Sequence, residues 1–197
     1  MLSPVGFWFL RHGETDWNAE GRSQGAVDVP LNANGEAQAE RAALLLKDAA
    51  IASISASPLR RAQRTAEIVA AALGLPVRYD PELREVAFAG REGQPIGAWY
   101  EDWIGGIATP EGAEPFAELA KRARRAVTAA LRRPAPVLVV SHGAFFRALR
   151  LSMHLSPEVR TPNGVPIFCD PPARPDQGWS LRAPRALSVV GAPGISG

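Results

Sequence analysis

Residues 5–15 read VGFWFLRHGET, and this segment is the strongest indication of the fold. Its first half is short, apolar and rich in aromatic side chains, and it ends abruptly in charge and glycine, which predicts a buried strand that opens into a loop. The pattern recurs much later, where the residues 137–143 read VLVVSHG. Ligands of open α/β sheets bind at such strand ends. We therefore expect His12 and His142 to lie at one ligand-binding edge of the sheet.

Length and composition limit the classes of protein to which the chain can belong. With 197 residues it is large enough to bury one core, and 46% hydrophobic with 21% charged residues fits neither a disordered nor a membrane protein. No apolar stretch approaches the roughly 20 residues of a membrane helix. The net charge of +2 argues against a nucleic-acid partner, and the single cysteine, Cys169, fits a reducing compartment. We expect a cytoplasmic protein that acts on a small molecule, with no nucleic-acid or membrane partner; its oligomeric state stays open.

The hydrophobic pattern alternates between strands and helices along the chain. Further strands are expected at 51–56, 77–79, 137–140, 165–168 and 179–181. Helices are expected from the N-cap Asn32 to about 48 with Ala37, Leu44 and Leu45 inward, from Ser57-Pro58 to 73, from 114 to 132, and from 143 to 153. Between them lie a polar loop at 15–31 and a loosely patterned stretch at 80–112. This order predicts an α/β three-layer sandwich with a mostly parallel central sheet, as one domain over 1–183, followed by a loose tail at 184–197.

Two arginines stand where helix electrostatics disfavours them. Arg60 and Arg61 fall in the first turn of their predicted helix, where the macrodipole makes a cation unfavourable by up to about 1 kcal/mol. A bound anion would remove this conflict, because guanidinium groups and free helix N–H groups both donate hydrogen bonds to phosphate. With Arg11 and the helix start after His142 at the same sheet edge, the residues predict a phosphate site.

These residues also resemble a known family. LRHGET with Trp17-Asn18, SPLRRA at 57–62 with Thr65-Ala66, LRE at 83–85 and SHG at 141–143 are similar to the motifs of the histidine phosphatase superfamily, the phosphoglycerate-mutase-like group. They occur in the same order, and the resemblance covers about residues 5–182.

The resemblance implies a role for each matching residue. His12 would be the nucleophile that becomes phosphorylated, with Arg11, Arg61 and His142 around the phosphoryl group. Glu85 matches the proton donor of the phosphatase branch. Further phosphate or substrate contacts would come from Asn18, Gln24, Gly25 and Gly143. Arg60 is the weaker match, because the arginine of the family stands immediately before alanine.

The chemistry of phosphoryl transfer is compatible with these roles. It depends mainly on positioning and on stabilising charge at the equatorial oxygens, which two arginines and a protonated His142 can provide, so no metal or other cofactor is required. Arg11 should disfavour protonation of His12 and keep it nucleophilic. Glu85 has to deliver a proton to the leaving oxygen and then help to activate water. Glu14 and Glu92 are alternatives for this carboxylate.

One departure from the family concerns substrate specificity. Where the family often has tryptophan in a Phe-Gly-x-Trp-Glu-Gly run, this chain has Arg91, which could meet a second anionic group or simply be solvated. Trp99 and Trp103 are interpreted as a packing pair that could also wall the pocket. His154 is interpreted as structural, and Arg122, Arg124 and Arg125 as the solvated face of a helix.

The favoured function is therefore a metal-independent phosphomonoester hydrolase. The alternatives are a cofactor-dependent phosphoglycerate mutase and a non-catalytic phosphate-binding module. A serine hydrolase is disfavoured because Ser141 lacks the Gly-x-Ser-x-Gly elbow, and the glycine fingerprints of P-loop and dinucleotide enzymes are absent. Hydrolysis is favoured over transfer because only a loose loop and one amphipathic helix are expected between Glu85 and His142, which leaves a phosphohistidine open to water.

Overall fold

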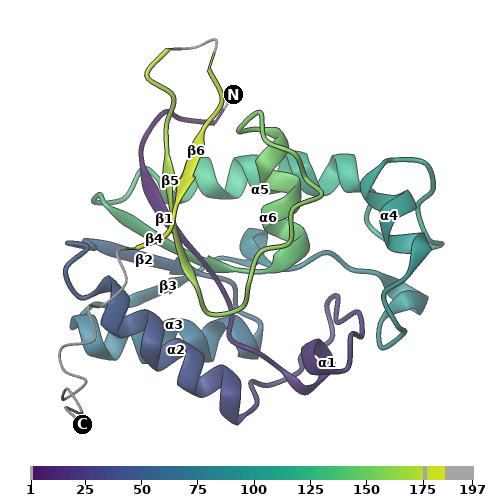
Figure 1. Cartoon of the computed structure of the whole chain (residues 1–197), viewed down its shortest axis with the longest axis horizontal. Helices are drawn as coiled ribbons and strands as arrows, with labels where there is room; N and C mark the ends of the chain where they lie inside the picture. The colour runs from purple at the N-terminus through teal and green to yellow at the C-terminus, as the bar shows by residue number, and fades with distance from the viewer. Residues whose placement is uncertain (1, 175–176, 185–197) are drawn as a thin grey trace, which may run out of the picture.

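The structure is a computed structural model that describes residues 2–174 and 177–184 (Figure 1). Its described part contains one six-stranded sheet with the strand order β3-β2-β4-β1-β5-β6. The strands are β1 (Phe7–Arg11), β2 (Ser53–Ala56), β3 (Val77–Tyr79), β4 (Val137–Ser141), β5 (Pro166–Asp170) and β6 (Ser180–Arg182). The pairs β1–β4, β2–β4 and β2–β3 are parallel, whereas β5 runs antiparallel to both β1 and β6. The predicted mostly parallel sheet is confirmed.

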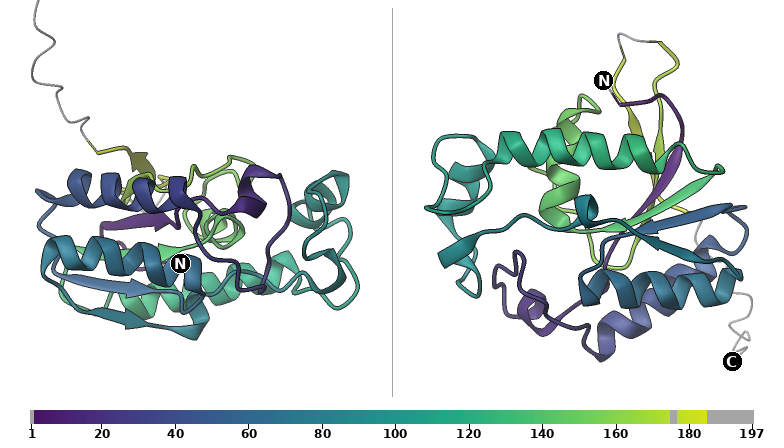
Figure 2. Two further views of the ribbon diagram at one scale, coloured as in Figure 1. Left: turned by 90° about the horizontal axis from the view of Figure 1, so that it is seen from below. Right: turned by 180° about the vertical axis from the view of Figure 1, so that it is seen from behind.

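Helices cover both faces of the sheet. The helices α2 (Ala33–Leu46) and α3 (Arg60–Leu73) pack on one face, and α5 (Phe116–Ala130) and α6 (Gly143–Leu151) pack on the other. The view from behind shows α5 and the α2–α3 pair on opposite sides of the strands (Figure 2). The remaining helices are short: α1 (Asp16–Ala19), α4 (Ala98–Ile104) and the 3₁₀ turns η1 (Pro81–Leu83) and η2 (Ala89–Arg91). The predicted three-layer sandwich is confirmed.

The alternation of side chains along β1 and β4 divides the core into two clusters. Phe7 and Phe9 belong to the cluster with α5 and α6, and Phe9 stacks on Phe146 with ring centroids 4.0 Å apart. Leu10 and Leu138 belong to the cluster with α2 and α3. Both strands are therefore buried on both faces, which is why they read as continuous apolar runs in the sequence.

The predicted start of α3 is wrong by two residues. The N-cap is Leu59, not Ser57, and it makes no side-chain cap. Asp28 from the 15–31 loop caps the helix instead, because its Oδ1 accepts a hydrogen bond from the Arg60 N–H at 2.6 Å. The hydroxyl of Ser57 accepts from the Leu59 N–H at 3.3 Å and lies 2.7 Å from the His142 Nε2. At α2, Asn32 is the N-cap as predicted and accepts from the Gly35 N–H at 2.8 Å.

The predicted inner face of α2 is also wrong. Leu44 is 58% exposed, while the buried positions are Gly35, Ala39, Ala42, Ala43 and Leu46. Small residues form this face because α2 lies closely against α3, where Ala62, Ala66 and Ala70 are also small. A leucine pattern is a poor guide to the buried side when the interface is built from alanine.

The stretch 80–112 is more ordered than its sequence pattern suggests. It contains α4, and an aromatic cluster joins it to α5: Phe88 contacts Trp99, Tyr100 and Trp103 edge to face, and Trp103 contacts Phe116. The two tryptophans pack on Phe88, and neither lines the cavity described below. The expectation of only a loose loop and one helix between Glu85 and His142 is therefore wrong.

Two further predictions concern the C-terminal tail and membrane helices. The predicted tail at 184–197 lies, apart from Pro184, outside the described residues. Within the described residues, no helix is both long and apolar enough to span a membrane.

Candidate active site

The parallel pairing of β1 and β4 brings the two histidines together. Arg11 is in register with Ser141, and the pairing continues one step further, since the His12 N–H donates to the Ser141 carbonyl at 3.0 Å. His12 and His142 each follow the end of these neighbouring strands. Their ring centroids consequently lie 5.2 Å apart.

A cavity of about 450 Å³ opens at this edge of the sheet. Most of the residues predicted for the site line it: Arg11, His12, Asn18, Gln24, Gly25, Arg61, Glu85 and Gly143. His142 does not line the cavity itself but lies directly behind His12, fully buried. The chain thus brings all nine predicted site residues into one place.

The ring of His12 is held in one orientation by the backbone. Its Nδ1 lies 2.7 Å from the Gly13 carbonyl, and because a carbonyl only accepts, Nδ1 carries the proton and Nε2 keeps its lone pair. Asn163 supports this loop by donating to the His12 carbonyl at 2.9 Å. Burial, followed by Arg61 and Arg11, holds the pKa of His12 well below its usual value. His12 is therefore neutral and available as a nucleophile at Nε2.

The two arginines beside His12 are buried and fixed by backbone carbonyls. Arg11 donates to the Thr161 carbonyl at 2.7 Å, and a Cβ at Gly143 would lie only 3.2 Å from the Arg11 Nε, so glycine leaves room for the guanidinium. Arg61 donates to the carbonyls of Val27 and Gly25 at 2.7 and 2.8 Å. Gly25 has a φ of +54°, a conformation that glycine adopts without strain. Burial is the main cause that lowers the pKa of both arginines to about 10, so both stay cationic at neutral pH.

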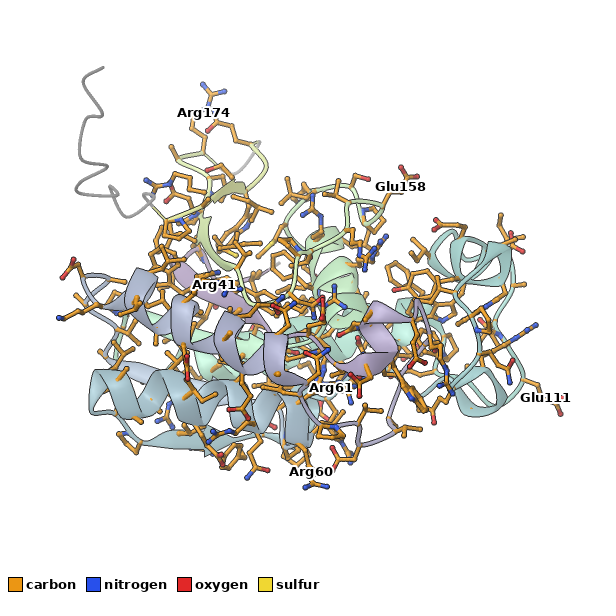
Figure 3. The ribbon with its side chains drawn as sticks, turned by 60° about the horizontal axis from the view of Figure 1, so that its bottom comes forward. Arg41, Arg60, Arg61, Glu111, Glu158 and Arg174 are labelled. Carbon is orange, nitrogen blue, oxygen red and sulfur yellow. The ribbon has the colours of Figure 1, made fainter. Side chains whose placement is uncertain are left out.

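Arg60 is turned away from this cavity. It is exposed and projects from the outer surface, whereas Arg61 points into the fold (Figure 3). The distinction drawn from the sequence, that the arginine before alanine is the one in the site, agrees with this arrangement.

Buried polar atoms without a hydrogen-bond partner concentrate around the cavity. They are Arg11 Nε, Ser23 Oγ, Gln24 Oε1, Arg61 Nε, His142 Nδ1 and Thr161 Oγ1, six of the seven such atoms found among the described residues. Leaving a buried polar group unpaired costs about 1–3 kcal/mol, so their gathering at one place indicates a site that binds a polar ligand. The two guanidinium Nε–H donors make an anion the fitting ligand.

His142 lies in surroundings that disfavour its protonated form. Its Nε2 lies 2.7 Å from the Ser57 hydroxyl. Burial, followed by the charge of Arg61, holds its pKa well below the usual value, which disfavours the protonated histidine expected from the sequence. The same arginines that build an anion site also repel a proton from a ring this close to them.

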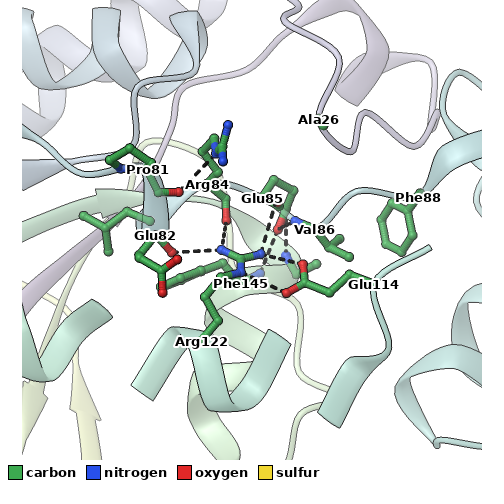
Figure 4. A network of polar contacts seen from close by, with 12 residues as sticks. Ala26, Pro81, Glu82, Arg84, Glu85, Val86, Phe88, Glu114, Arg122 and Phe145 are labelled. Carbon is green, nitrogen blue, oxygen red and sulfur yellow. Dashed lines mark hydrogen bonds and ion pairs between the residues drawn. The ribbon is translucent and has the colours of Figure 1, made fainter. Parts of the chain in front are cut away.

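Glu85 lies across the cavity at the start of α6. Its carboxylate oxygens accept from the N–H groups of Ala144 and Phe145 at 3.0 and 2.9 Å. The backbone just before Glu85 is held by Arg122, which donates to the carbonyls of Glu82 and Arg84 at 2.8 and 2.7 Å (Figure 4). The carboxylate is thus fixed at the side of the cavity opposite the α2–α3 layer.

Arg122 does not lie on the solvated face of α5, where the sequence pattern predicted it. Its guanidinium also forms an ion pair with Glu114 at 2.6 Å, and its side chain is only 14% exposed (Figure 4). Arg124 is exposed as predicted, and Arg125 pairs with Glu82 at the surface. Arg122 therefore belongs to the support of the Glu85 segment and not to the solvated face of α5.

The two alternative carboxylates lie elsewhere. Glu14 bonds to Asn32 at the start of α2 and does not line the cavity. Glu92 accepts from the N–H groups of Ala26 and Phe88 at 2.7 and 3.1 Å, so it clasps the 15–31 loop to the stretch beside α4. This clasp supports the Gly25 and Val27 carbonyls that hold Arg61. Glu85 is the one predicted acid that reaches the cavity.

Several lining residues were not predicted from the sequence: Ser23, Tyr100, Arg147, Arg160 and Thr161. Arg147 lies one helical turn after Gly143, a spacing that could have placed it on the same face of α6. The others belong to segments without periodicity, and no local signal identifies them. Arg91, in contrast, lies outside the cavity, with its guanidinium 5.5 Å from the Trp99 ring. His154 is exposed and does not line this cavity.

No metal-binding group accompanies the cavity in the described part of the chain, where His, Cys, Asp and Glu side chains nowhere form a group of three or more that could hold an ion.

Fold and site together match one family. Residues 7–161 match the histidine phosphatase superfamily (branch 1), and the chain belongs to this family. Among its relatives, a probable phosphoglycerate mutase GpmB of Yersinia enterocolitica is 42% identical over 148 residues, which cover 69% of this chain and 68% of that protein. The corresponding protein of Escherichia fergusonii is 39% identical over the same lengths.

Solved structures of the family have the same fold. The mycobacterial glucosyl-3-phosphoglycerate phosphatase in complex with VO3 is 27% identical, with a TM-score of 0.77 over 90% of this chain and 96% of that one. TTHB049 of Thermus thermophilus is 33% identical, with a TM-score of 0.71 over 84% of this chain and 94% of that one. The similar proteins thus include both phosphatases and mutases by name.

Proposed function

We propose that the protein is a metal-independent phosphomonoester hydrolase that works through a phosphohistidine on His12. One observation carries this proposal: the lone pair of His12 Nε2 is available in a cavity where Arg11 and Arg61 present unpaired Nε–H donors. A neutral imidazole nucleophile beside two guanidinium groups is the combination that phosphoryl transfer requires.

The reaction has two steps. In the first, Nε2 forms a bond to phosphorus as the bond from phosphorus to the leaving oxygen breaks, and Glu85 gives its proton to that oxygen. In the second, water attacks phosphorus, Glu85 takes up the proton of the water, and the P–N bond breaks to release phosphate and neutral His12. Throughout both steps, Arg11 and Arg61 stabilise the charge on the equatorial oxygens, a task that other enzymes give to Mg²⁺.

Phosphoglycerate mutase is the second candidate, and the names of the GpmB relatives favour it. A mutase must keep water away from its phosphohistidine, and α4 with its aromatic cluster gives more cover than the sequence suggests. Hydrolysis is favoured because Gly21, Ile96, Glu101 and Arg160 are exposed and yet line the cavity, so its mouth is open to water. A solved structure that is similar in fold is a phosphatase by name, which adds support. A non-catalytic phosphate-binding module is disfavoured, since nucleophile, arginines and acid are all present. The single cysteine favours the cytoplasm as the place of this activity.

The test measures phosphate release from a panel of phosphomonoesters, together with trapping of the enzyme during turnover. We expect steady phosphate release and an acid-labile, base-stable phosphate on the protein, both absent in His12→Ala. His154→Asn is the matched control, because His154 is exposed and asparagine tolerates its φ of +58°. Substantial hydrolysis by His12→Ala would contradict the nucleophile assignment. Conversion of 3- to 2-phosphoglycerate with added bisphosphoglycerate and without net phosphate release would establish the mutase instead.

A further inference from the structure

The cavity contains a second group of cationic side chains that the proposed reaction does not use. Arg147, on α6, is half-buried, and its guanidinium carbon lies 5.6 Å from the centre of the Tyr100 ring. Its Nη1 donates to the carbonyls of Pro157 and Glu158 at 3.1 and 2.8 Å. These two bonds fix the guanidinium in place, and they leave its Nε–H and Nη2–H donors without an acceptor among the described residues.

Arg160 reaches the same cavity from the segment that follows α6. Its guanidinium has no hydrogen bond or ion pair to any described residue, although it lines the cavity. The next residue, Thr161, is only 3% exposed, and its buried hydroxyl has no partner and also lines the cavity. The carbonyl of Thr161 accepts from Arg11, so this segment is anchored to the phosphoryl site. Free donors and one buried unpaired hydroxyl thus stand next to each other.

Contacts within α6 relate Arg147 to Glu85. The Glu85 carboxylate accepts from the Ala144 and Phe145 N–H groups in the first turn of α6, and Arg147 follows on the same helix, beside the Tyr100 ring. The bonds of Arg147 to the Pro157 and Glu158 carbonyls join it to the segment that carries Arg160. Glu85, Tyr100, Arg147 and Arg160 all line the cavity, and since Glu85 is the proposed donor to the leaving oxygen, this group of arginines is on the side where the alcohol part of the substrate leaves.

We propose that Arg147, Arg160 and Thr161 form a second anion subsite, so that the substrate is a phosphomonoester whose alcohol part carries another anionic group. The anion is a carboxylate or a second phosphate, because either one accepts hydrogen bonds from a pair of guanidinium groups. Glu101 is the carboxylate that lines the same cavity besides Glu85; it is exposed, so solvent screens its repulsion. This inference rests on the proposed function, because the proposed role of Glu85 defines the side on which the alcohol part of the substrate leaves.

The test compares pairs of substrates that differ by the second anion only. 3-Phosphoglycerate is paired with glycerol 1-phosphate, and propane-1,3-diol bisphosphate is paired with its monophosphate. We expect the wild type to have the higher kcat/KM for the anionic member of at least one pair. R160Q and R147Q should each lower that ratio about tenfold, as expected when a charge-assisted hydrogen bond is lost. The pair that responds identifies carboxylate or phosphate as the ligand group.

Matched variants separate this effect from general damage. R91Q removes the same charge from an exposed arginine beside the cavity and should change the ratio less than twofold. Since R147Q also loses the bonds to Pro157 and Glu158, R147K, which keeps the charge, should recover part of the ratio. An equal ratio in wild type, R160Q and R147Q for both pairs overturns the subsite.

Binding to the His12→Ala protein distinguishes failure of the subsite from failure of the proposed function. Calorimetric titration with the same pairs reports the preference for the anionic member without any turnover. If no pair is hydrolysed by the wild type but the preference persists in binding, only the proposed hydrolysis fails. If turnover is normal and no preference is found in either measurement, only the subsite fails.

Discussion

Replacement of Arg122 by alanine tests how the Glu85 segment is supported. The guanidinium donates two bonds to Glu114, at 2.9 and 2.6 Å, and two to the carbonyls of Glu82 and Arg84, at 2.8 and 2.7 Å. Hydrogen bonds to charged groups contribute about 1.5–3 kcal/mol each, but they are not additive within one network. Removing one partner of a buried pair costs about 3–5 kcal/mol. Because Glu114 keeps 22% of its side chain exposed, we expect a lower figure, about 2–3 kcal/mol of unfolding free energy.

Urea unfolding measures this loss, and kinetics measure its effect on the site. Arg122→Ala should lower the unfolding midpoint and should also lower kcat more for alkyl phosphates than for 4-nitrophenyl phosphate, since Glu85 is less well placed to protonate a poor leaving group. Arg124→Ala is the matched control, an exposed arginine on the same helix, and should change stability by less than about 0.5 kcal/mol. Equal destabilisation of Arg122→Ala and Arg124→Ala would contradict this supporting role of Arg122.

Three further predictions concern the acid, the anion pocket and pH. Glu85→Gln should slow alkyl phosphates severely and spare an activated aryl phosphate, because a good leaving group needs little proton donation; equal losses on both would move the acid elsewhere. EDTA should leave phosphatase activity intact, while vanadate should inhibit by occupying the arginine pocket, and activity that EDTA abolishes and Mg²⁺ restores would contradict the role of the arginines. The pKa values of the buried His12 and His142 are depressed, so below the unfolded-state histidine pKa of about 6.5 the unfolded chain binds more protons than the folded one. The free energy of unfolding should therefore decrease as the pH is lowered below about 6.5. Between pH 6 and 5, the slope of the unfolding free energy against pH should approach about 1.4 kcal/mol per pH unit for each histidine. Urea unfolding at several pH values should show this slope halved in His12→Ala. An unchanged slope in His12→Ala would mean that His12 is not held neutral in the folded protein.

The sheet and the centre of the candidate site could be predicted from the amino-acid pattern alone. The runs that became β1 and β4 are apolar on both faces, a pattern that only a strand buried between two helical layers satisfies. Because parallel strands end at the same edge of a sheet, the residues that follow them, His12 and His142, had to meet. The conflict of Arg61 with the dipole of α3 likewise marked an anion site from the sequence alone.

The start of α3, the buried face of α2 and the order around α4 depend on long-range contacts in the folded chain. At α3, Asp28 from a distant loop accepts from the Arg60 N–H at the first turn, whereas the Ser57 hydroxyl lies between the Leu59 N–H and His142. At α2, an alanine interface with α3 overruled the leucine pattern. These outcomes depend on partners far away in the chain, which a local pattern does not contain.

The same dependence on distant partners explains why several residues of the site could not be predicted from the sequence. Arg122 has the spacing of a solvated helical residue. It donates to the carbonyls of the 82–85 segment only because α5 packs beside that segment. The charge of His142 depends on burial and on Arg61, both set by the assembled fold. Arg147, Arg160 and Tyr100 converge from α6, the segment after it and α4. The place proposed for phosphate chemistry could therefore be predicted from the sequence, because it depends on strand ends. The other side of the cavity could not, because it is built from segments with no periodicity of their own.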